Sequence, residues 1–243
     1  MVTGGTRGIG AGIARAFLRG GARVVVCARN EPAGLPGDGD HAAVFTRADV
    51  RDPRAAHLAV RYALDLYGRV DVVVSNAGGS PPADAATASP RLHAKVIELN
   101  LIAPLHVAQA ANAVMQDQPG GGSVIFVGSV SGVRPSPGTA AYGAAKAGLH
   151  HLATSLAIEW APKVRVNTVV PGMVATGTAA DHYGPSPEAV AATIPLRRMA
   201  TPDDVAAACV FLASPGAAYI SGATLAVHGG GEPPAFLMYA APK

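Results

Sequence analysis

The chain has 243 residues, which is enough for one domain with a full two-faced α/β core. Hydrophobic residues make up 49% and charged residues 14%, a balance that excludes a disordered chain. The net charge is only +3 and the basic residues are scattered. The composition therefore predicts no nucleic-acid partner and no membrane partner.

The two cysteines, Cys27 and Cys209, both stand in apolar runs, which predicts buried free thiols. They offer neither a disulfide framework nor the spacing of a zinc site, so no metal is expected. No apolar run reaches the length of a membrane-spanning helix, and no signal peptide is recognisable. We expect a cytoplasmic protein.

Apolar runs alternate with segments of helical periodicity along almost the whole chain. Runs such as Val24-Val25-Val26 are β-branched throughout, which is typical of parallel strands buried on both faces. Strands are expected at 22–28, 41–48, 70–76, 123–128, 164–170 and 223–227, and helices at 8–19, 53–67, 89–115, 139–160 and 202–213. The alternation predicts a single domain over residues 1–243, α/β in class, with a Rossmann-type doubly wound parallel sheet and helices on both faces.

Two segments depart from this pattern. Residues 31–40 are rich in Gly and Pro, so we expect a loop where the second crossover helix would stand. Met1-Val2-Thr3 leave only a stub for the first strand, which such a sheet places in its interior. Either that strand is very short, or the natural protein begins upstream of Met1.

A glycine-rich turn, residues 3–10 (TGGTRGIG), leads from this stub into the first helix. Glycines permit positive φ and let backbone N–H groups approach a pyrophosphate, which the helix N-terminus also favours. Its G-x-x-x-G-x-G spacing differs from the G-x-G-x-x-G dinucleotide fingerprint, and a plain tight connection is the alternative.

The end of the second strand bears on the choice of cofactor. An acidic residue there would bind a ribose 2′-hydroxyl, but Ala28 stands at that position and Arg29 follows it. Arg7 projects from the turn toward the same region. Two guanidinium groups suit a 2′-phosphate, so we expect NADP(H) as the cofactor. The alternative is that Arg29 is a solvated loop residue.

Further motifs follow in order. Together with the turn, they are Asp49-Val50, Asn76-Ala77-Gly78-Gly79, Asn100, Ser129, Tyr142-x-x-x-Lys146 and Pro171-Gly172. Over essentially the whole chain this set resembles the short-chain dehydrogenase/reductase family. Residues 194–231 resemble the C-terminal part of 3-oxoacyl-acyl-carrier-protein reductases and related NADPH-dependent ketoreductases. The resemblance implies hydride transfer between NADP(H) and a carbonyl or secondary alcohol.

Tyr142 and Lys146 stand four residues apart, so a helix places both on one face. A free tyrosine titrates near pH ~10, and lowering its pKa by about three units requires roughly 4 kcal/mol. We expect the Lys146 ammonium and an oxidised nicotinamide to supply it, so that Tyr142 acts as general acid/base.

The resemblance gives the other site residues their roles. It implies that Ser129, rather than its neighbour Ser131, steadies the substrate oxygen, and that Asn100 orders a water chain to Lys146; the alternative for Asn100 is a local hydrogen-bonding device. Asp49 would accept from the adenine amino group, and Asn76 would brace the sheet. The expected cofactor-binding residues are Gly4, Thr6, Arg7, Gly8, Ile9, Gly10, Arg29, Asp49, Val50, Asn76, Ala77, Gly78, Tyr142, Lys146, Pro171, Gly172, Val174 and Thr176.

The substrate is less well defined. Carrier-protein reductases present basic residues at two positions that correspond here to Gly120 and Lys163, so an unattached ketone is at least as good a candidate. Residues 174–195 are the expected substrate lid. The apolar stretch 236–239 in a C-terminal extension, 232–243, is expected to cover a neighbouring subunit or the site mouth. His150 and His151 are expected in packing or a subunit contact.

The resemblance also implies a homotetramer, or a homodimer. A non-catalytic NADP-sensing or scaffold protein is the alternative from another class. Such proteins typically lose the tyrosine and lysine that are intact here.

Overall fold

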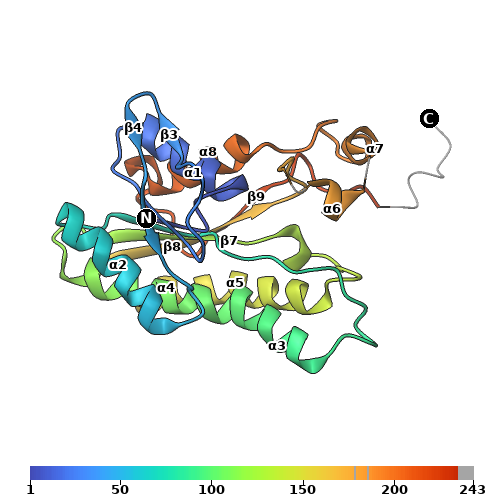
Figure 1. Cartoon of the computed structure of the whole chain (residues 1–243), viewed down its shortest axis with the longest axis horizontal. Coiled ribbons are helices and arrows are strands. Elements are labelled where there is room, and N and C mark those ends of the chain that lie inside the picture. The colour runs from blue at the N-terminus through green and yellow to red at the C-terminus, as the bar shows by residue number, and fades with distance from the viewer. Residues whose placement is uncertain (178, 185, 235–243) are drawn as a thin grey trace.

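The computed structural model describes residues 1–177, 179–184 and 186–234. At its centre is a seven-stranded parallel sheet in the order β5-β2-β1-β6-β7-β8-β9 (Figure 1). The strands are β1 (Val2–Thr3), β2 (Val25–Ala28), β5 (Val44–Arg47), β6 (Val72–Ser75), β7 (Gly122–Val127), β8 (Val164–Pro171) and β9 (Thr224–Val227). The doubly wound sheet predicted from the sequence is confirmed.

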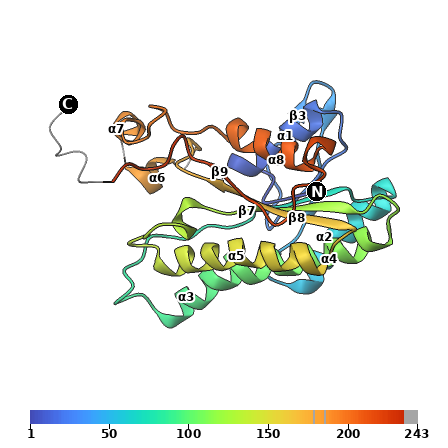
Figure 2. The same ribbon diagram turned by 180° about the vertical axis from the view of Figure 1, so that it is seen from behind.

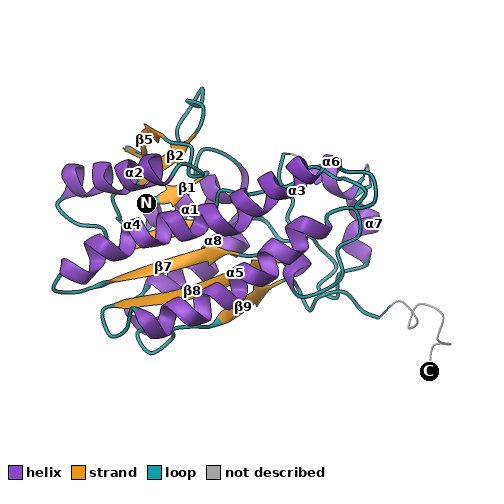
Figure 3. Ribbon diagram, turned by 90° about the horizontal axis from the view of Figure 1, so that it is seen from below, coloured by secondary structure: helices purple, strands orange, loops and turns teal. Residues whose placement is uncertain are grey.

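Helices cover both faces of this sheet, as the two opposite views show (Figures 1 and 2). One face carries α1 (Gly8–Arg19) and α8 (Pro202–Ala213). The other carries α2 (Pro53–Tyr67), α4 (Ala103–Asp117) and α5 (Ala140–Glu159), and α3 (Pro90–Ile97) continues that layer beyond the sheet (Figure 3). None of the helices in the described part of the chain is long and apolar enough to cross a bilayer.

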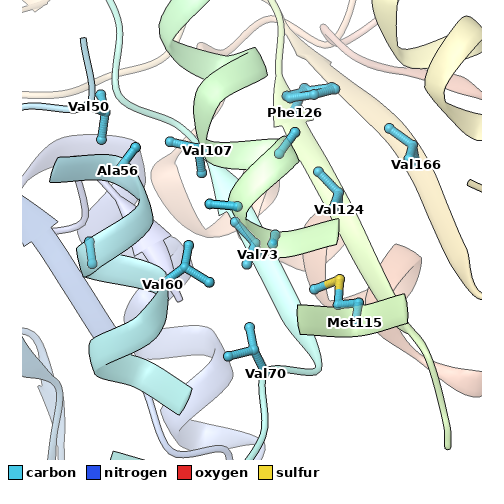
Figure 4. Packing of buried hydrophobic residues seen from close by; sticks show 14 of the residues in the cluster. Val50, Ala56, Val60, Val70, Val73, Val107, Met115, Val124, Phe126 and Val166 are labelled. Atoms are coloured by element: carbon cyan, nitrogen blue, oxygen red, sulfur yellow. The ribbon is translucent and has the colours of Figure 1, made fainter. Parts of the chain in front are cut away.

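Each side of the sheet has its own hydrophobic core. On the α2, α4 and α5 side, Val60, Val107 and Phe126 belong to one cluster and have almost no exposed surface (Figure 4). The core below α1 and α8 includes Ile13 and Ile125. Neighbouring residues of β7, such as Ile125 and Phe126, thus enter opposite cores, as expected for a strand covered on both faces. Cys27 and Cys209 are buried free thiols, as predicted.

The first strand is short but lies in the sheet interior. Val2 pairs with Val26 of β2 on one side and with Val74 of β6 on the other. The second crossover contains no helix, as expected, and instead forms a small hairpin of β3 (Gly37–Asp38) and β4 (His41–Ala42). The strand predicted at 41–48 is therefore divided, and only β5 joins the main sheet.

The single helix predicted at 89–115 is also wrong. It is divided into α3, a π-helical turn (Glu98–Ile102) and α4. In that turn the Ala103 amide donates to the Glu98 carbonyl, five residues back, rather than to the residue four back. The predicted lid contains two short helices, α6 (Ala179–Tyr183) and α7 (Pro187–Ala192). Of the C-terminal extension only 232–234 are described, so the apolar stretch at 236–239 lies outside the described residues.

Candidate active site

The candidate site lies where the chain reverses its direction of travel across the sheet. From β1 the chain moves outward to β2 and β5, then returns to β6 on the other side of β1. Ligands of doubly wound sheets bind at the carboxyl ends of strands beside such a switch point. Three of the predicted segments, the glycine-rich turn, Asn76 and Ser129, follow β1, β6 and β7 directly. The sheet topology therefore brings them to one edge.

A clamp between Thr3 and Asn76 joins the ends of β1 and β6. The buried Thr3 hydroxyl accepts from the backbone N–H groups of Asn76 and Ala77, both at 3.0 Å. In return the Asn76 amide donates to the Thr3 and Gly4 carbonyls, at 3.0 and 3.3 Å. Thr3 is a supporting residue to which the sequence analysis gave no role in the site, and its place directly before the glycine run is the only signal in the sequence.

The glycine-rich turn is packed tightly against the protein and open on its outer side. A Cβ on Gly10 would lie 2.3 Å from the Gly4 carbonyl oxygen. Gly8 has a φ of +54°, and a Cβ there would meet nothing closer than Thr176 at 3.7 Å. Helix α1 begins at Gly8 and has no side-chain cap. A glycine cradle and an uncapped helix N-terminus suit the pyrophosphate of a dinucleotide.

The adenosine end of the cofactor is expected beside three charged side chains, those of Asp49, Arg51 and Arg29. Asp49 accepts from Arg51, whose Nε lies 2.9 Å from Oδ1 and whose Nη2 bonds Oδ2. This pairing holds the pKa of Asp49 below its ordinary value, and Arg29 adds to the effect. The two carboxylate oxygens of Asp49, which were expected to accept from the adenine amino group, thus already accept from Arg51. The sequence analysis missed Arg51. Asp-Val-Arg shows no spacing that would have revealed the pair.

The catalytic candidates converge beside the end of β7. Lys146 is buried and donates from Nζ to the Val127 carbonyl at 2.8 Å, and Nζ lies 5.6 Å from the centre of the Tyr142 ring. Ser129 lies close enough to the Tyr142 hydroxyl to lower its pKa in part. The Ser129 hydroxyl accepts from the Ser131 backbone N–H at 3.1 Å. A hydroxyl, a phenol and a lysine are therefore brought together as the sequence predicted.

The electrostatics differ from the expectation for Tyr142. Burial raises its pKa, Ser129 lowers it in part, and Tyr183 raises it further. Lys146 is not among these influences; its ammonium lies over the ring face and bonds to Val127. Burial also lowers the pKa of Lys146 to about 8. The polypeptide groups alone therefore do not lower the pKa of Tyr142.

Asn100 lies in the π-helical turn, fully buried. Its Oδ1 accepts from Gly79 N at 2.9 Å, and its Nδ2 donates to the Gly79 carbonyl at 2.8 Å and to the Val96 carbonyl at 2.9 Å. A Cβ on Gly78 would lie 2.7 Å from Asn100 Oδ1 and 3.4 Å from Lys146 Nζ. Gly78 thus separates Asn100 from Lys146 and leaves no room for a larger side chain there.

The remaining predicted residues lie around the same edge. Pro171 ends β8, Gly172 donates to the Val227 carbonyl at 2.9 Å, and Val174 forms a β-bridge with Ala200. The influence of Tyr183 on Tyr142 places α6, in the segment predicted to form a lid, beside the site. The described residues contain no cluster of His, Cys, Asp or Glu that could hold a metal.

An ion pair borders the catalytic loop. Arg134 Nη2 lies 2.6 Å from Oε1 of Glu232, the first residue of the C-terminal extension. A cavity of about 280 Å³ lies elsewhere, at the amino ends of β1, β2 and β6, away from Tyr142 and Ser129. The chemistry-bearing residues and this cavity are therefore at opposite ends of the strands.

A family model described as enoyl-(acyl carrier protein) reductase matches residues 4–232. The chain belongs to the short-chain dehydrogenase/reductase family. This short-chain dehydrogenase/reductase is 38% identical over 233 residues to a 3-oxoacyl-[acyl-carrier-protein] reductase of Mycobacterium bovis, covering 95% of this chain and 91% of that one. It is 36% identical over 242 residues to an L-rhamnose 1-dehydrogenase (NAD(P)(+)) of Azotobacter vinelandii, covering 95% and 94%.

Among solved structures, ElxO with NADP bound is similar at a TM-score of 0.86 and 27% identity, covering 94% of this chain and 96% of that one. Members of the family are oxidoreductases that use nicotinamide cofactors. The cradle at the glycine-rich turn fits such a cofactor.

Proposed function

We propose that this short-chain dehydrogenase/reductase is an NADP(H)-dependent ketoreductase that interconverts a carbonyl compound and a secondary alcohol. The observation that carries the proposal is the convergence of Ser129, Tyr142 and Lys146 at the carboxyl end of β7, beside the glycine cradle. That edge is where the fold binds its ligands.

In this mechanism Ser129 and Tyr142 hold the substrate carbonyl oxygen between two hydroxyl groups. The bound nicotinamide supplies the hydride that the carbonyl carbon receives. Tyr142 donates its phenolic proton to the carbonyl oxygen, which becomes the alcohol hydroxyl. The raised pKa of Tyr142 suits this proton-donor state. The Tyr142 phenolate then regains its proton from Lys146, and a water ordered by Asn100, behind Gly78, restores the proton that Lys146 has given up.

The preference for NADP(H) is supported by Arg7 and Arg29, which flank the turn and the end of β2. The residues proposed to hold the cofactor are Gly4, Thr6, Arg7, Gly8, Ile9, Gly10, Arg29, Asp49, Val50, Asn76, Ala77, Gly78, Tyr142, Lys146, Pro171, Gly172, Val174 and Thr176. The ElxO structure, which contains NADP, is consistent with this choice.

An unattached carbonyl compound is the favoured substrate, and a 3-oxoacyl group on a carrier protein is the second candidate. The Mycobacterium bovis relative supports the carrier-bound candidate. Against it, Lys163 donates to the Gln118 carbonyl near the amino ends of β7 and β8, the edge opposite Tyr142. One of the two compared positions thus has its basic residue at that distant edge, and the other lies in a glycine run. This arrangement does not favour docking of a carrier protein beside the site.

We also propose that the protein assembles as a homotetramer or a homodimer. Large apolar side chains are exposed on both helical layers, including Ile158 at the end of α5 and Phe211 of α8. Sedimentation velocity of the full chain tests this part, and a monomer at micromolar concentration would contradict it.

Cofactor titration followed by kinetics tests the proposal. NADPH and NADH are titrated by fluorescence against the wild type, Arg29→Ala and, as a control, Arg91→Ala, an exposed arginine of α3. We expect NADPH to bind the wild type more tightly, with a loss of roughly 10- to 100-fold in Arg29→Ala only, because a charge-assisted contact is removed. Equal binding of NADH and NADPH by the wild type would contradict the assignment.

Tyr142→Phe is then assayed on a panel of ketones with NADPH. It should still bind NADPH but lose at least ~100-fold in kcat, since the proton donor is absent. Near-normal turnover would remove Tyr142 from the mechanism, and a wild type that binds NADPH without any turnover would favour the sensing alternative.

A further inference from the structure

His150 is a buried histidine directly behind the proposed catalytic serine. It stands on α5 one turn after Lys146 and is 9% exposed, whereas its neighbour His151 is exposed. The mechanism above does not use it. A buried imidazole needs hydrogen-bonding partners, so its contacts define what it does there.

The ring lies against the loop that carries Ser129. The Ser129 backbone N–H donates to His150 Nε2 at 3.4 Å. A Cβ on Gly128 would lie 2.3 Å from Nε2, and a Cβ on Gly132 would lie 2.7 Å from Cε1. The imidazole therefore occupies space that two glycines leave free, on both sides of Ser129 in the chain.

The direction of the hydrogen bond determines the form of the ring. Because Nε2 accepts, it carries no proton, and the ring is neutral with its proton on Nδ1. Burial, with a further contribution from the charge of Lys146, holds the pKa of His150 below its ordinary value, which is consistent with a neutral ring.

We propose that His150 is a positioning residue that holds the Ser129 loop so that the Ser129 hydroxyl reaches Tyr142. The inference rests on the proposed function for its effect on turnover, but not for its structural content. Ser129 has an extended backbone and its hydroxyl accepts from Ser131, so its side chain is oriented from within the loop. His150 accepts a hydrogen bond from the backbone N–H of the same residue and so fixes its backbone. Neither role requires His150 to touch the substrate.

Two substitutions separate hydrogen bonding from packing. His150→Gln places an amide oxygen near the position of Nε2 and keeps an acceptor, while His150→Leu fills similar space without one. His151→Leu is the matched exposed control. We expect His150→Leu to lower kcat roughly 10- to 100-fold, as small misplacements of reacting groups do, with little change in KM or in NADPH affinity. His150→Gln should recover most of the loss, and His151→Leu should resemble the wild type.

Equal kcat losses in His150→Leu and His150→Gln, or wild-type kcat in His150→Leu, would overturn the proposal. A measurement independent of turnover accompanies the kinetics: ¹⁵N NMR of the imidazole in the wild type at about pH 7. A neutral ring protonated on Nδ1 supports the proposal, and a charged ring or one protonated on Nε2 overturns it. If the wild type or Tyr142→Phe contradicts the ketoreductase assignment, the NMR result still decides whether His150 holds the loop.

Discussion

Asn100 and Gly79 form a reciprocal pair of hydrogen bonds: Gly79 N donates to Asn100 Oδ1 at 2.9 Å, and Asn100 Nδ2 donates to the Gly79 carbonyl at 2.8 Å. The second Nδ2 proton goes to the Val96 carbonyl. One amide thus joins the loop after β6 to the π-helical turn, in addition to any role in proton relay.

Asn100→Ala is therefore expected to destabilise the fold as well as to slow turnover. It leaves the N–H and carbonyl of Gly79 without these partners, which costs about 1–3 kcal/mol for such groups. Urea unfolding measures the change, with Asn112→Ala of the half-buried helix surface as control. If the free energy of unfolding of Asn100→Ala equals that of the wild type, the reciprocal pair contributes no stability.

Thr3→Val removes the acceptor of the clamp while keeping the shape of the side chain. Two backbone N–H groups, of Asn76 and Ala77, then lose their partner. We expect a loss of about 2–4 kcal/mol in the free energy of unfolding and weaker NADPH binding, because the glycine turn is no longer tied to β6. Thr3→Ser keeps the hydroxyl and should retain most of both. Equal behaviour of the two variants would mean that the hydroxyl is not the important group.

Gly10→Ala tests the cradle. Its Cβ would lie 2.3 Å from the Gly4 carbonyl oxygen, a backbone atom that can move only with the turn. We expect NADPH affinity to fall by at least ~10-fold, because the displaced turn misplaces its N–H groups. The control is Gly20→Ala at the other end of α1, where the nearest contact is an ordinary 3.4 Å and φ is −76°. Unchanged affinity in Gly10→Ala would show that the turn does not hold the phosphates.

Lys146→Met should separate function from stability. The pKa of Lys146 is about 8 in the fold against an ordinary 10.5, so below pH 8 the buried ammonium is present and destabilises the folded state, on the order of 3 kcal/mol. As pH rises from 8 to 10.5 the folded protein releases this proton before the unfolded chain does, and stability increases. Lys146→Met lacks this dependence.

The stability of the wild type relative to Lys146→Met should therefore rise by roughly 1–2 kcal/mol between about pH 7 and about pH 9.5, measured by urea unfolding without cofactor. Lys95→Met, an exposed site on α3, serves as control and should show no such trend. A difference independent of pH would mean that the Lys146 ammonium is well solvated in the fold. Turnover of Lys146→Met should be lost throughout.

The sequence predicted the sheet well because its strands are β-branched and buried on both faces, a pattern set by burial alone. It could not predict the π-helical turn, since residues 98–102 (ELNLI) have ordinary helical composition and the contact of Asn100 with Gly79 spans 21 positions of the chain. The hairpin at 37–42 was missed for a similar reason: only its lack of a helix is visible in the Gly and Pro content.

Two of the contacts that the sequence analysis missed join residues that lie far apart in the chain. Tyr142 and Lys146 share a helix face by spacing alone. In contrast, His150 meets Ser129 across 21 positions and Thr3 meets Asn76 across 73. The rise that burial causes in the pKa of Tyr142, and the placement of Lys146 over the ring face, could not be read from the sequence because both follow from tertiary packing.

The π-helical turn between α3 and α4 rotates the side chains of α4 relative to those of α3. A turn closed over five residues accommodates one residue more than an α-helical turn, and one residue corresponds to a rotation of about 100°. Asn100 can therefore face Gly79 while Val107 and Met115, further along, still face the sheet. Deleting a single residue from 98–102 would leave a regular helix. In that helix Asn100 could no longer face Gly79 while Val107 and Met115 face the sheet. The length of this segment, independently of its composition, thus couples the active site to the core.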